Sequence, residues 1–373
     1  MSVLILYSGK YPGSSPGAKR IGYYQRGLEA AGLKTEIKTI SLKSKQRIVL
    51  EIEKLLLPFK TFFLFLKWRR QYDILFIYGF NWLTYVLLSL ICRFSNVKLY
   101  LEINEKPGTV YGNRLSELKL MKFFYVVTYR FSLRFIDGFV VISEALKTYL
   151  KPYTDKGARL IIIPIIIDIE RKGLHAQSLV THDFLLHAGA LSDRKDGIGE
   201  LIEAFALVCK KISRPFHLYF TSKQAPKELL DKINQVISLN DLADRVHFLG
   251  NISESNLLAY QKYCRMLVIN KHINDQNLHN FPTKLGEFLI LERPVITTGV
   301  GEMGKYLKHN ENSIIVPVNN VPALANAILY ILNNPEVSKR LAENGKITAQ
   351  THFNFMIQGK RLAEFLNLKS EAS

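Results

Sequence analysis

The 373-residue sequence is poor in acidic residues and in cysteine. Its 32 Asp and Glu are outnumbered by 50 Lys and Arg, and the formal charge is +18. The 3 cysteines, Cys92, Cys209 and Cys264, lie far apart and form no Cys-x-x-Cys pair. We therefore expect reduced thiols in a reducing compartment, and neither a disulfide framework nor a cysteine-based metal site.

Other missing features narrow the class of protein. The first expected strand begins at Val3, which leaves no room for a signal peptide and predicts a cytoplasmic protein. Residues 74–92 carry no charge, and about 20 apolar residues would be enough to span a bilayer. A strand over 74–78 and a helix over 82–91 explain this run better, because Asn81 between them is a good helix N-cap.

The positive charge is concentrated in one half of the chain. Residues 1–180 contain 28 Lys and Arg against 13 Asp and Glu, whereas residues 181–373 contain 22 against 19. Such an excess predicts an anionic partner, which could be a nucleic acid, an acidic membrane or a phosphorylated lipid. Residues 52–70 and 114–134 mix aromatic with basic residues. Each could be a core-facing helix or a membrane-surface helix, and their place in the basic half favours contact with an anionic membrane.

Short β-branched or aromatic runs alternate with helical stretches, which is typical of parallel α/β architecture. Six strands are expected in each half. We therefore predict two Rossmann-like, doubly wound domains that face a central cleft, over residues 1–170 and 171–354. A last helix, at about 355–368, is expected to pack back on the first domain. The expected strands are 3–7, 35–39, 74–77, 98–102, 138–142 and 160–163, then 184–188, 217–221, 246–248, 266–270, 295–297 and 313–316.

Two loops between a strand and a helix contain residues suited to anions. In open α/β sheets, ligands bind beyond the carboxyl ends of the strands. The first loop, residues 7–21, lacks Gly-x-Gly-x-x-Gly and the P-loop pattern, but it leads into Lys19 and Arg20, which could meet an anionic substrate or be surface charges. The second, residues 187–197, contains Gly189, where the backbone can approach a ligand closely, and Arg194 and Lys195, which could neutralise a diphosphate.

The most specific pattern lies in residues 280–297. Pro282 is suited to open a helix, and Lys284 and Glu287 are three residues apart on its first turn. One side chain could bind phosphate while the other accepts hydrogen bonds from ribose hydroxyls. A surface ion pair on the helix is the alternative.

With these segments in order, the sequence resembles the retaining glycosyltransferases of family 4, the "glycosyl transferases group 1" set with the GT-B fold. Pro-Thr-Lys-Leu-Gly-Glu followed by Arg-Pro-Val-Ile is similar to that family's Pro-Ser-Lys-x-x-Glu variant. The similar segments cover most of the chain. They are 137–144, Pro164 with Asp168, 189–205, 246–250, 282–287 and 293–296.

The resemblance implies acceptor binding in the first domain and nucleotide-sugar binding in the second. By position, Glu287 would hold the ribose and Lys195 the diphosphate. Family members need no metal, and no cofactor is expected because the nucleotide-sugar is a substrate. The predicted catalytic residues are Lys195, Arg194 and Glu105, the donor-binding residues are Gly189, Lys284, Glu287, Thr283 and His279, and the acceptor-binding residues are Lys19, Arg20 and Asn104.

The sequence departs from the family pattern at three places. His279 stands where many members have a second Glu, and Ala190 stands where an Arg is frequent, with Arg194 as a possible substitute. A His often found after the fourth strand is replaced by residues 102–107, so Glu105 or Asn104 would orient the acceptor hydroxyl. These departures leave the transferred sugar open, and the sequence does not identify the nucleotide base, the acceptor or the linkage.

The predicted function is transfer of a sugar from a nucleotide-sugar to a glycan or lipid-linked acceptor, with retention, in the synthesis of cell-surface polysaccharide or glycolipid. We expect peripheral contact with the inner face of an anionic membrane. A sugar-nucleotide 2-epimerase of the same fold and a non-catalytic membrane-docking protein are the alternatives. A nucleic-acid binder is suggested by charge alone, and no recognition motif supports it.

Overall fold

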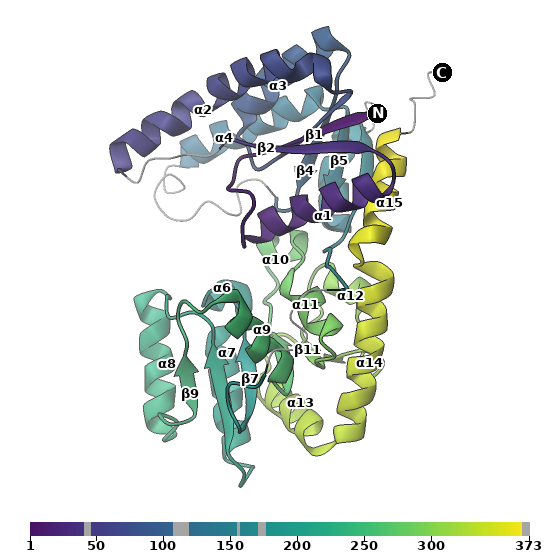
Figure 1. Cartoon of the computed structure of the whole chain (residues 1–373). Coiled ribbons are helices and arrows are strands. Elements are labelled where there is room, and N and C mark those ends of the chain that lie inside the picture. The colour runs from purple at the N-terminus through teal and green to yellow at the C-terminus, as the bar shows by residue number, and fades with distance from the viewer. Residues whose placement is uncertain (41–45, 107–118, 155–156, 171–176, 368–373) are drawn as a thin grey trace. The chain divides into compact units, whose positions relative to one another are not determined.

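The computed structural model describes residues 1–40, 46–106, 119–154, 157–170 and 177–367. The chain forms two compact units, of which unit 1 comprises Met1–Ile167 and Asn354–Ser373, and unit 2 comprises Asp168–Phe353 (Figure 1). Each unit contains a six-stranded parallel sheet covered by helices. The predicted α/β class with two Rossmann-like folds is confirmed, and each expected strand overlaps an observed one.

The sheet of unit 1 has the strand order β2-β1-β3-β4-β5-β6. All neighbouring strands are parallel. The chain places β2 on one side of β1 and β3 on the other, and such a reversal opens a crevice at the carboxyl ends of the strands. The strands are β1 (Ser2–Tyr7), β2 (Lys34–Thr39), β3 (Ile74–Tyr78), β4 (Lys98–Ile103), β5 (Gly138–Val141) and β6 (Arg159–Ile162).

Helices α2, α3 and α4 lie side by side in unit 1, whereas α1 contacts α15 (Figure 1). The uncharged run of residues 74–92 is divided between β3 and α3, and the Asn81 side chain caps α3 by accepting a hydrogen bond from Thr84 N, as predicted. No helix in the described part of the chain is both long enough and apolar enough to cross a membrane. The helices are α1 (Pro16–Ala30), α2 (Arg47–Trp68), α3 (Trp82–Ser95), α4 (Lys119–Ser132), α5 (Glu144–Thr154) and α15 (Phe355–Asn367), with short 3-10 turns η1 (Arg69–Gln71) and η2 (Leu133–Phe135).

The last helix, α15, is held against α1 by a crossing of two glycines. A Cβ atom on Gly27 would lie 2.7 Å from the Cα of Gly359, so neither position has room for a larger residue. Beside this crossing, the Arg26 guanidinium lies 4.2 Å from the centre of the Phe355 ring, and Tyr23 stacks on the same ring. The C-terminal segment thereby becomes part of unit 1.

The sheet of unit 2 has the order β12-β11-β10-β7-β8-β9, with the reversal between β7 and β10. Its strands are β7 (Asp183–His187), β8 (Phe216–Phe220), β9 (Val246–Phe248), β10 (Met266–Ile269), β11 (Val295–Thr297) and β12 (Ile314–Ile315). The helices are α6 (Asp193–Asp196), α7 (Ile198–Cys209), α8 (Lys227–Leu239), α9 (Glu254–Tyr263), α10 (Asp275–His279), α11 (Lys284–Ile290), α12 (Met303–Tyr306), α13 (Val321–Asn333) and α14 (Pro335–His352).

Candidate functional site

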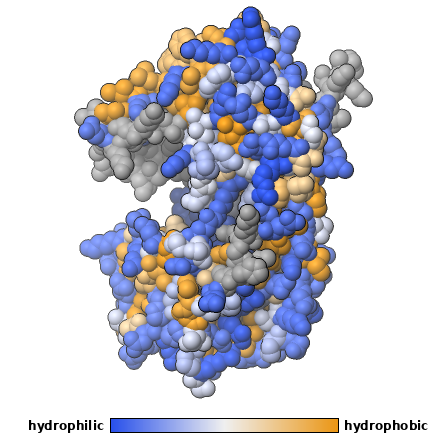
Figure 2. Space-filling model, in the orientation of Figure 1, coloured by the Kyte–Doolittle hydropathy of each residue, from blue (hydrophilic) through white to orange (hydrophobic). Residues whose placement is uncertain are grey.

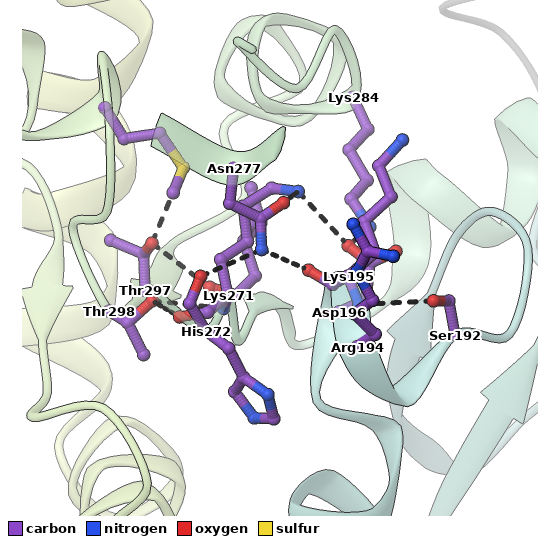
Figure 3. Close-up of polar contacts among 12 residues, drawn as sticks. Ser192, Arg194, Lys195, Asp196, Lys271, His272, Asn277, Lys284, Thr297 and Thr298 are labelled. Atoms are coloured by element: carbon purple, nitrogen blue, oxygen red, sulfur yellow. Dashed lines mark hydrogen bonds and ion pairs between the residues drawn. The ribbon is translucent and has the colours of Figure 1, made fainter. Parts of the chain in front are cut away.

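Three neighbouring strands of unit 2 end in polar side chains. Strand β7 ends at His187, β10 is followed by Asn270 and Lys271, and β11 by Thr298. The carboxyl ends of parallel strands meet at one edge of a sheet, so these residues gather there. The segments after β10 and β11 are tied together, since Lys271 N donates to Thr298 Oγ1 at 3.0 Å and Thr298 Oγ1 donates to the Lys271 carbonyl at 2.8 Å (Figure 3).

Two lysines converge on one carboxylate at this edge (Figure 3). Lys284 Nζ lies 3.3 Å and Lys271 Nζ 3.6 Å from Asp196 Oδ1. The Lys271 side chain is only 1% exposed, and its ammonium also donates to Asn277 Oδ1 at 3.2 Å. The three charges come from α6, from the segment after β10 and from α11, so they meet only in the folded unit.

The electrostatics of the cluster show an excess of positive charge. Burial raises the pKa of Asp196, but Lys284 and Lys271 outweigh this effect and lower it to about 2. Burial lowers the pKa of Lys271 to about 8, with repulsion from Lys284 and Lys195 adding to the effect and Asp196 opposing it. Burial also lowers the pKa of Lys284. One carboxylate therefore leaves the ammonium groups only partly balanced, and an anionic ligand would complete the balance.

The loop from β7 to α7 carries the predicted residues Arg194 and Lys195. The Ser192 side chain caps α6 by accepting from Lys195 N at 3.2 Å. Two asparagines fix the backbone, since Asn274 donates to the Arg194 carbonyl at 2.9 Å and Asn277 donates to the Lys195 carbonyl at 3.0 Å. Arg194 is exposed, whereas Lys195 is half-buried.

In the first turn of α7, one backbone N–H already has a carboxylate partner. Gly199 N donates to Asp193 Oδ1 at 2.7 Å, so a carboxylate of the same loop already occupies this position. Gly197, with φ of +53°, joins α6 to α7, and a Cβ there would collide with the Asn270 side chain. The Gly199 N–H is therefore already satisfied, whereas Arg194 on the same loop is exposed.

His187 and Gly189 border the same loop. His187 is 1% exposed, and its Nε2 has no hydrogen-bond partner among the described residues. Burial, reinforced by Lys284, lowers its pKa to about 3, so the ring is neutral at physiological pH. Gly189 has φ of +125°, a conformation that L side chains rarely adopt, and no atom lies within 4 Å of where its Cβ would be. The backbone at Gly189 therefore borders open space.

Helix α11 carries the most specific motif of the sequence. Thr283 directly precedes it and Lys284 begins it. Glu287, on the same helix, is half-buried, and its Oε2 accepts from Gln261 Nε2 of α9 at 3.1 Å. Lys284 and Glu287 thus each engage a residue from another element, Lys284 with Asp196 and Glu287 with Gln261. The predicted donor residue His279 ends α10, where its Nδ1 lies 2.7 Å from the Asp275 carbonyl.

The carboxyl edge of the unit 1 sheet carries aromatic and amide groups. The rings of Tyr7 and Tyr78 stack with centroids 5.6 Å apart, and Asn104 Nδ2 donates to the Tyr78 hydroxyl at 2.9 Å. Asn104 Oδ1 is buried without a hydrogen-bond partner in the described residues. Burial, with Glu102 adding to it, raises the pKa of Tyr78 to about 12. The half-buried Glu105 follows Asn104, so the two predicted residues lie together beyond β4.

Arg20 differs from its expected role. Its side chain is 4% exposed, and its Nε lies 2.5 Å from Glu102 Oε1. Its two other nitrogens donate to the carbonyls of Pro164 and Ile163, at 2.6 and 2.7 Å. The buried guanidinium therefore links α1 to β4 and to the segment that follows β6. The neighbouring Lys19 remains at the half-buried first turn of α1.

Our sequence reasoning missed several residues of the unit 2 edge. Lys271, Asp196 and His187 sit at or just beyond strand ends or in the loop already selected, and the rule that ligands bind at carboxyl ends would have found them. A glycine-rich loop at 299–304 was also missed. There Gly301 has φ of +70°, and a Cβ would lie 2.5 Å from the Asn277 carbonyl oxygen.

Comparisons with known proteins agree with this architecture. Residues 175–348 match the family model described as "Glycosyl transferases group 1". An uncharacterized glycosyltransferase of Methanocaldococcus jannaschii is 27% identical over 210 residues, 56% of this chain. The match spans 54% of that relative, about half of its length.

Solved structures match over nearly the whole chain. Sucrose-phosphate synthase from Thermosynechococcus elongatus has a TM-score of 0.72 and 18% identity, covering 98% of each chain. Anabaena HepE in complex with UDP has a TM-score of 0.69 and 16% identity, covering 98% of this chain and 99% of that one, and HepE was also solved with UDP-glucose. The protein therefore has the GT-B fold of glycosyltransferases, and its second unit matches the group 1 glycosyl transferases.

Proposed function

We propose that the protein is a glycosyltransferase that moves a hexose from a nucleotide-sugar to a glycan or lipid-linked acceptor. The observation that carries this proposal is the cluster of Asp196, Lys271 and Lys284, with Lys195 beside it, at the carboxyl edge of the unit 2 sheet. A diphosphate supplies the negative charge that this cluster lacks. The segment that matches the group 1 glycosyl transferases contains all four residues.

The proposed donor lies along this edge. The diphosphate meets Lys195 and Lys284, close to the open backbone at Gly189, and the Glu287 carboxylate, positioned by Gln261, accepts hydrogen bonds from the ribose hydroxyls. The neutral His187 ring is buried beside this edge, with its Nε2 unpartnered among the described residues. UDP-glucose is the first donor to test, because the structurally similar HepE was solved with it.

The chemistry of transfer follows from these charges. As the bond between the sugar and the diphosphate breaks, negative charge grows on the diphosphate, and fixed cations aimed at it lower the barrier. Transfer with retention is the proposed outcome, as in family 4: the acceptor hydroxyl attacks on the face of the leaving group and gives its proton to the departing phosphate. Asn104 and Glu105 of unit 1 are proposed to orient that hydroxyl. No catalytic metal is proposed.

The experiment is a donor screen followed by a transfer assay. We expect UDP or another nucleotide to raise the melting temperature, since a ligand that binds the folded state stabilises it. Glu287→Ala should weaken donor binding by about 1.5–3 kcal/mol, the worth of a hydrogen bond to a charged group. Stabilisation by no nucleotide-sugar would contradict the proposal, as would unchanged affinity in a folded Glu287→Ala protein. Epimerised sugar without transfer would support the epimerase instead.

We further propose that unit 1 docks on an anionic membrane. Helix α2 exposes an apolar stripe at helical spacing, made of Ile52, Leu55, Leu56, Phe59 and Phe63, with Leu55 69% exposed. The adjacent α3 and α4 add exposed apolar side chains, among them Phe94 at 87% and Phe123, Val127 and Phe131. We call these residues the α2–α4 apolar face, and Figure 2 shows hydrophobic surface along this part of unit 1.

Basic side chains around the α2–α4 apolar face indicate that it binds an anionic membrane. Exposed basic side chains lie on the same helices, including Lys60, Lys67, Arg93 and Arg130. Apolar side chains that enter the headgroup region beside basic residues are typical of interfacial helices on anionic lipid. A lipid-linked acceptor on the cytoplasmic face of a membrane fits this arrangement. Residues 114–118, which begin the second basic stretch, lie outside the described residues.

Flotation with lipid vesicles tests the docking. The protein should float with vesicles that contain phosphatidylglycerol, and binding should weaken as salt rises because salt screens the attraction. Neutral phosphatidylcholine vesicles are the control. Failure to float at low salt would contradict the membrane proposal and favour a soluble acceptor. Self-association of the protein at low concentration would assign the face to a second copy.

A further inference from the structure

Three histidines of unit 2 form a cluster away from the proposed donor edge. They are His182, His217 and His247, and their nearest ring nitrogens all lie within 4.8 Å of one another. His217 Nδ1 is 3.0 Å from His247 Nε2, and the rings of His182 and His217 stack with centroids 3.6 Å apart. Each ring is half-buried, so solvent reaches the cluster.

Sheet geometry explains why the three meet. His182 directly precedes β7, and His217 and His247 are each the second residue of β8 and β9. These strands are parallel neighbours, so the three histidines lie at the amino ends of the strands, at the edge opposite the Asp196 cluster.

Strand register also places them on one face. Phe184 pairs with His217, and Tyr219 pairs with His247. Residues two apart in a strand share a face, which puts His182 beside Phe184 and His217 beside Tyr219. All three imidazoles therefore project from the same side of the sheet.

We propose that His182, His217 and His247 bind a divalent transition-metal ion, Zn²⁺ in the first instance. Imidazole nitrogens suit Zn²⁺, and three protein ligands leave a fourth position for solvent. Zn–N bonds of about 2.0–2.1 Å place neighbouring ligand nitrogens roughly 3.3 Å apart, close to the observed separation of His217 and His247. His182 would reach the same centre by turning its ring out of the stack with His217 and away from the Tyr219 hydroxyl.

Protonation supports this assignment. Burial, with the neighbouring His182 and His247 adding to it, lowers the pKa of His217 to about 4. The pKa of His247 is also lowered, by burial and by His182. A metal requires neutral imidazole, so at neutral pH little work is needed to remove protons from His217 and His247.

The bound ion would act on the structure of unit 2 and not on sugar transfer. It would join the segment that enters the unit at His182 to β8 and to the edge strand β9, which is only 3 residues long. This inference does not depend on the proposed function, and it assigns a metal where the cysteine pattern and the family resemblance indicated none. The competing interpretation is an aromatic stack, because Tyr219 lies 4.4 Å from the His247 ring and 2.9 Å, through its hydroxyl, from His182 Nε2.

Metal titration of the full chain without an affinity tag distinguishes a metal site from an aromatic stack. We expect the wild type to bind one Zn²⁺ by calorimetry, to show the d–d absorption of a nitrogen-ligated ion with Co²⁺, and to melt at a higher temperature with Zn²⁺. His217→Gln and His247→Gln should each weaken binding by more than the roughly 10–100-fold that loss of an outer-sphere partner costs. Tyr219→Phe, which removes only the hydroxyl, should have a smaller effect.

His309→Gln is the matched control, since His309 is exposed and outside the cluster. It should bind Zn²⁺ like the wild type. The proposal is overturned if the wild type takes up neither Zn²⁺ nor Co²⁺. This outcome does not depend on whether any variant folds. It is also overturned if folded His217→Gln and His247→Gln proteins keep the wild-type affinity, or if His309→Gln loses it.

Discussion

The two units hold their positive charge in different ways. Unit 1 lies in the strongly basic half of the sequence, yet its basic residues are mostly at the surface, and the buried Arg20 is neutralised by Glu102. Unit 2 comes from a nearly balanced half, yet Lys271 and Lys284 meet at one carboxylate. Buried charges interact strongly whereas exposed charges are screened, so the place of a charge matters more than the net count.

The largest expected effect lies in the buried pair of unit 1. Arg20→Met leaves Glu102 buried without its cation, and breaking such a pair costs about 3–5 kcal/mol. We expect the free energy of unfolding to fall by this amount in urea titration, while donor affinity in unit 2 is kept. The double variant Arg20→Met with Glu102→Leu should recover much of the loss. A stable Arg20→Met protein with a higher KM for the acceptor would return Arg20 to the acceptor site.

In unit 2, removal of a lysine from the Asp196 cluster should affect catalysis more than the stability of the fold. Lys284→Ala removes a cation from the proposed leaving group, and loss of one such group costs about 10²–10³-fold in kcat. Lys195→Ala should lower kcat more than donor affinity, because the charge on the diphosphate grows in the transition state. Lys227→Ala, at an exposed position of α8, is the control. Equal kcat in the Lys284→Ala and Lys227→Ala proteins would contradict the site, and a damaging Arg194→Ala with a neutral Lys195→Ala would exchange those two roles.

A pH titration examines the buried charge of unit 2 without changing its shape. The pKa of Lys271 is lowered to about 8 in the free site, and a bound diphosphate should raise it. Above about pH 8 the free lysine is neutral and must take up a proton on binding, so affinity for UDP should fall as pH rises, by up to about tenfold per pH unit. Calorimetry from pH 7 to 9.5 measures this effect. Asp196 stays ionised and His187 neutral throughout this range, and Lys271→Met should remove the dependence attributed to Lys271.

Surface charges of unit 1 should have the smallest effect per residue. Lys60→Gln, Lys67→Gln and Arg70→Gln should each weaken vesicle binding by about 1 kcal/mol. Their effect on the free energy of unfolding should stay within about 0.5 kcal/mol, as is usual for surface substitutions. Flotation and urea titration on the same proteins measure both. Unchanged flotation of the triple variant would mean that the apolar side chains alone hold the membrane.

The local pattern of residue types was sufficient to predict the strands and helices. Runs such as Ile74–Tyr78 are buried strands because β-branched and aromatic residues suit a covered sheet, and Asn81 caps α3 because its side chain reaches N–H groups only three residues away. The loops after β1, β7 and before α11 could also be selected, since turn and cap residues act over short distances. The roles of the individual residues in those loops stay predictions.

The strands, the helices and the loops at the sheet edges follow from the local sequence, because they depend on neighbours along the chain. Which charges are buried and which side chains meet depends instead on how distant elements pack together. Arg20 and Glu102 are 82 residues apart, and Lys284 and Asp196 are 88 apart. Charge alone would allow each of them at the surface. Packing of separate elements removes water around them, and the loss of solvation turns one lysine pair into a candidate diphosphate site and one arginine into a structural ion pair.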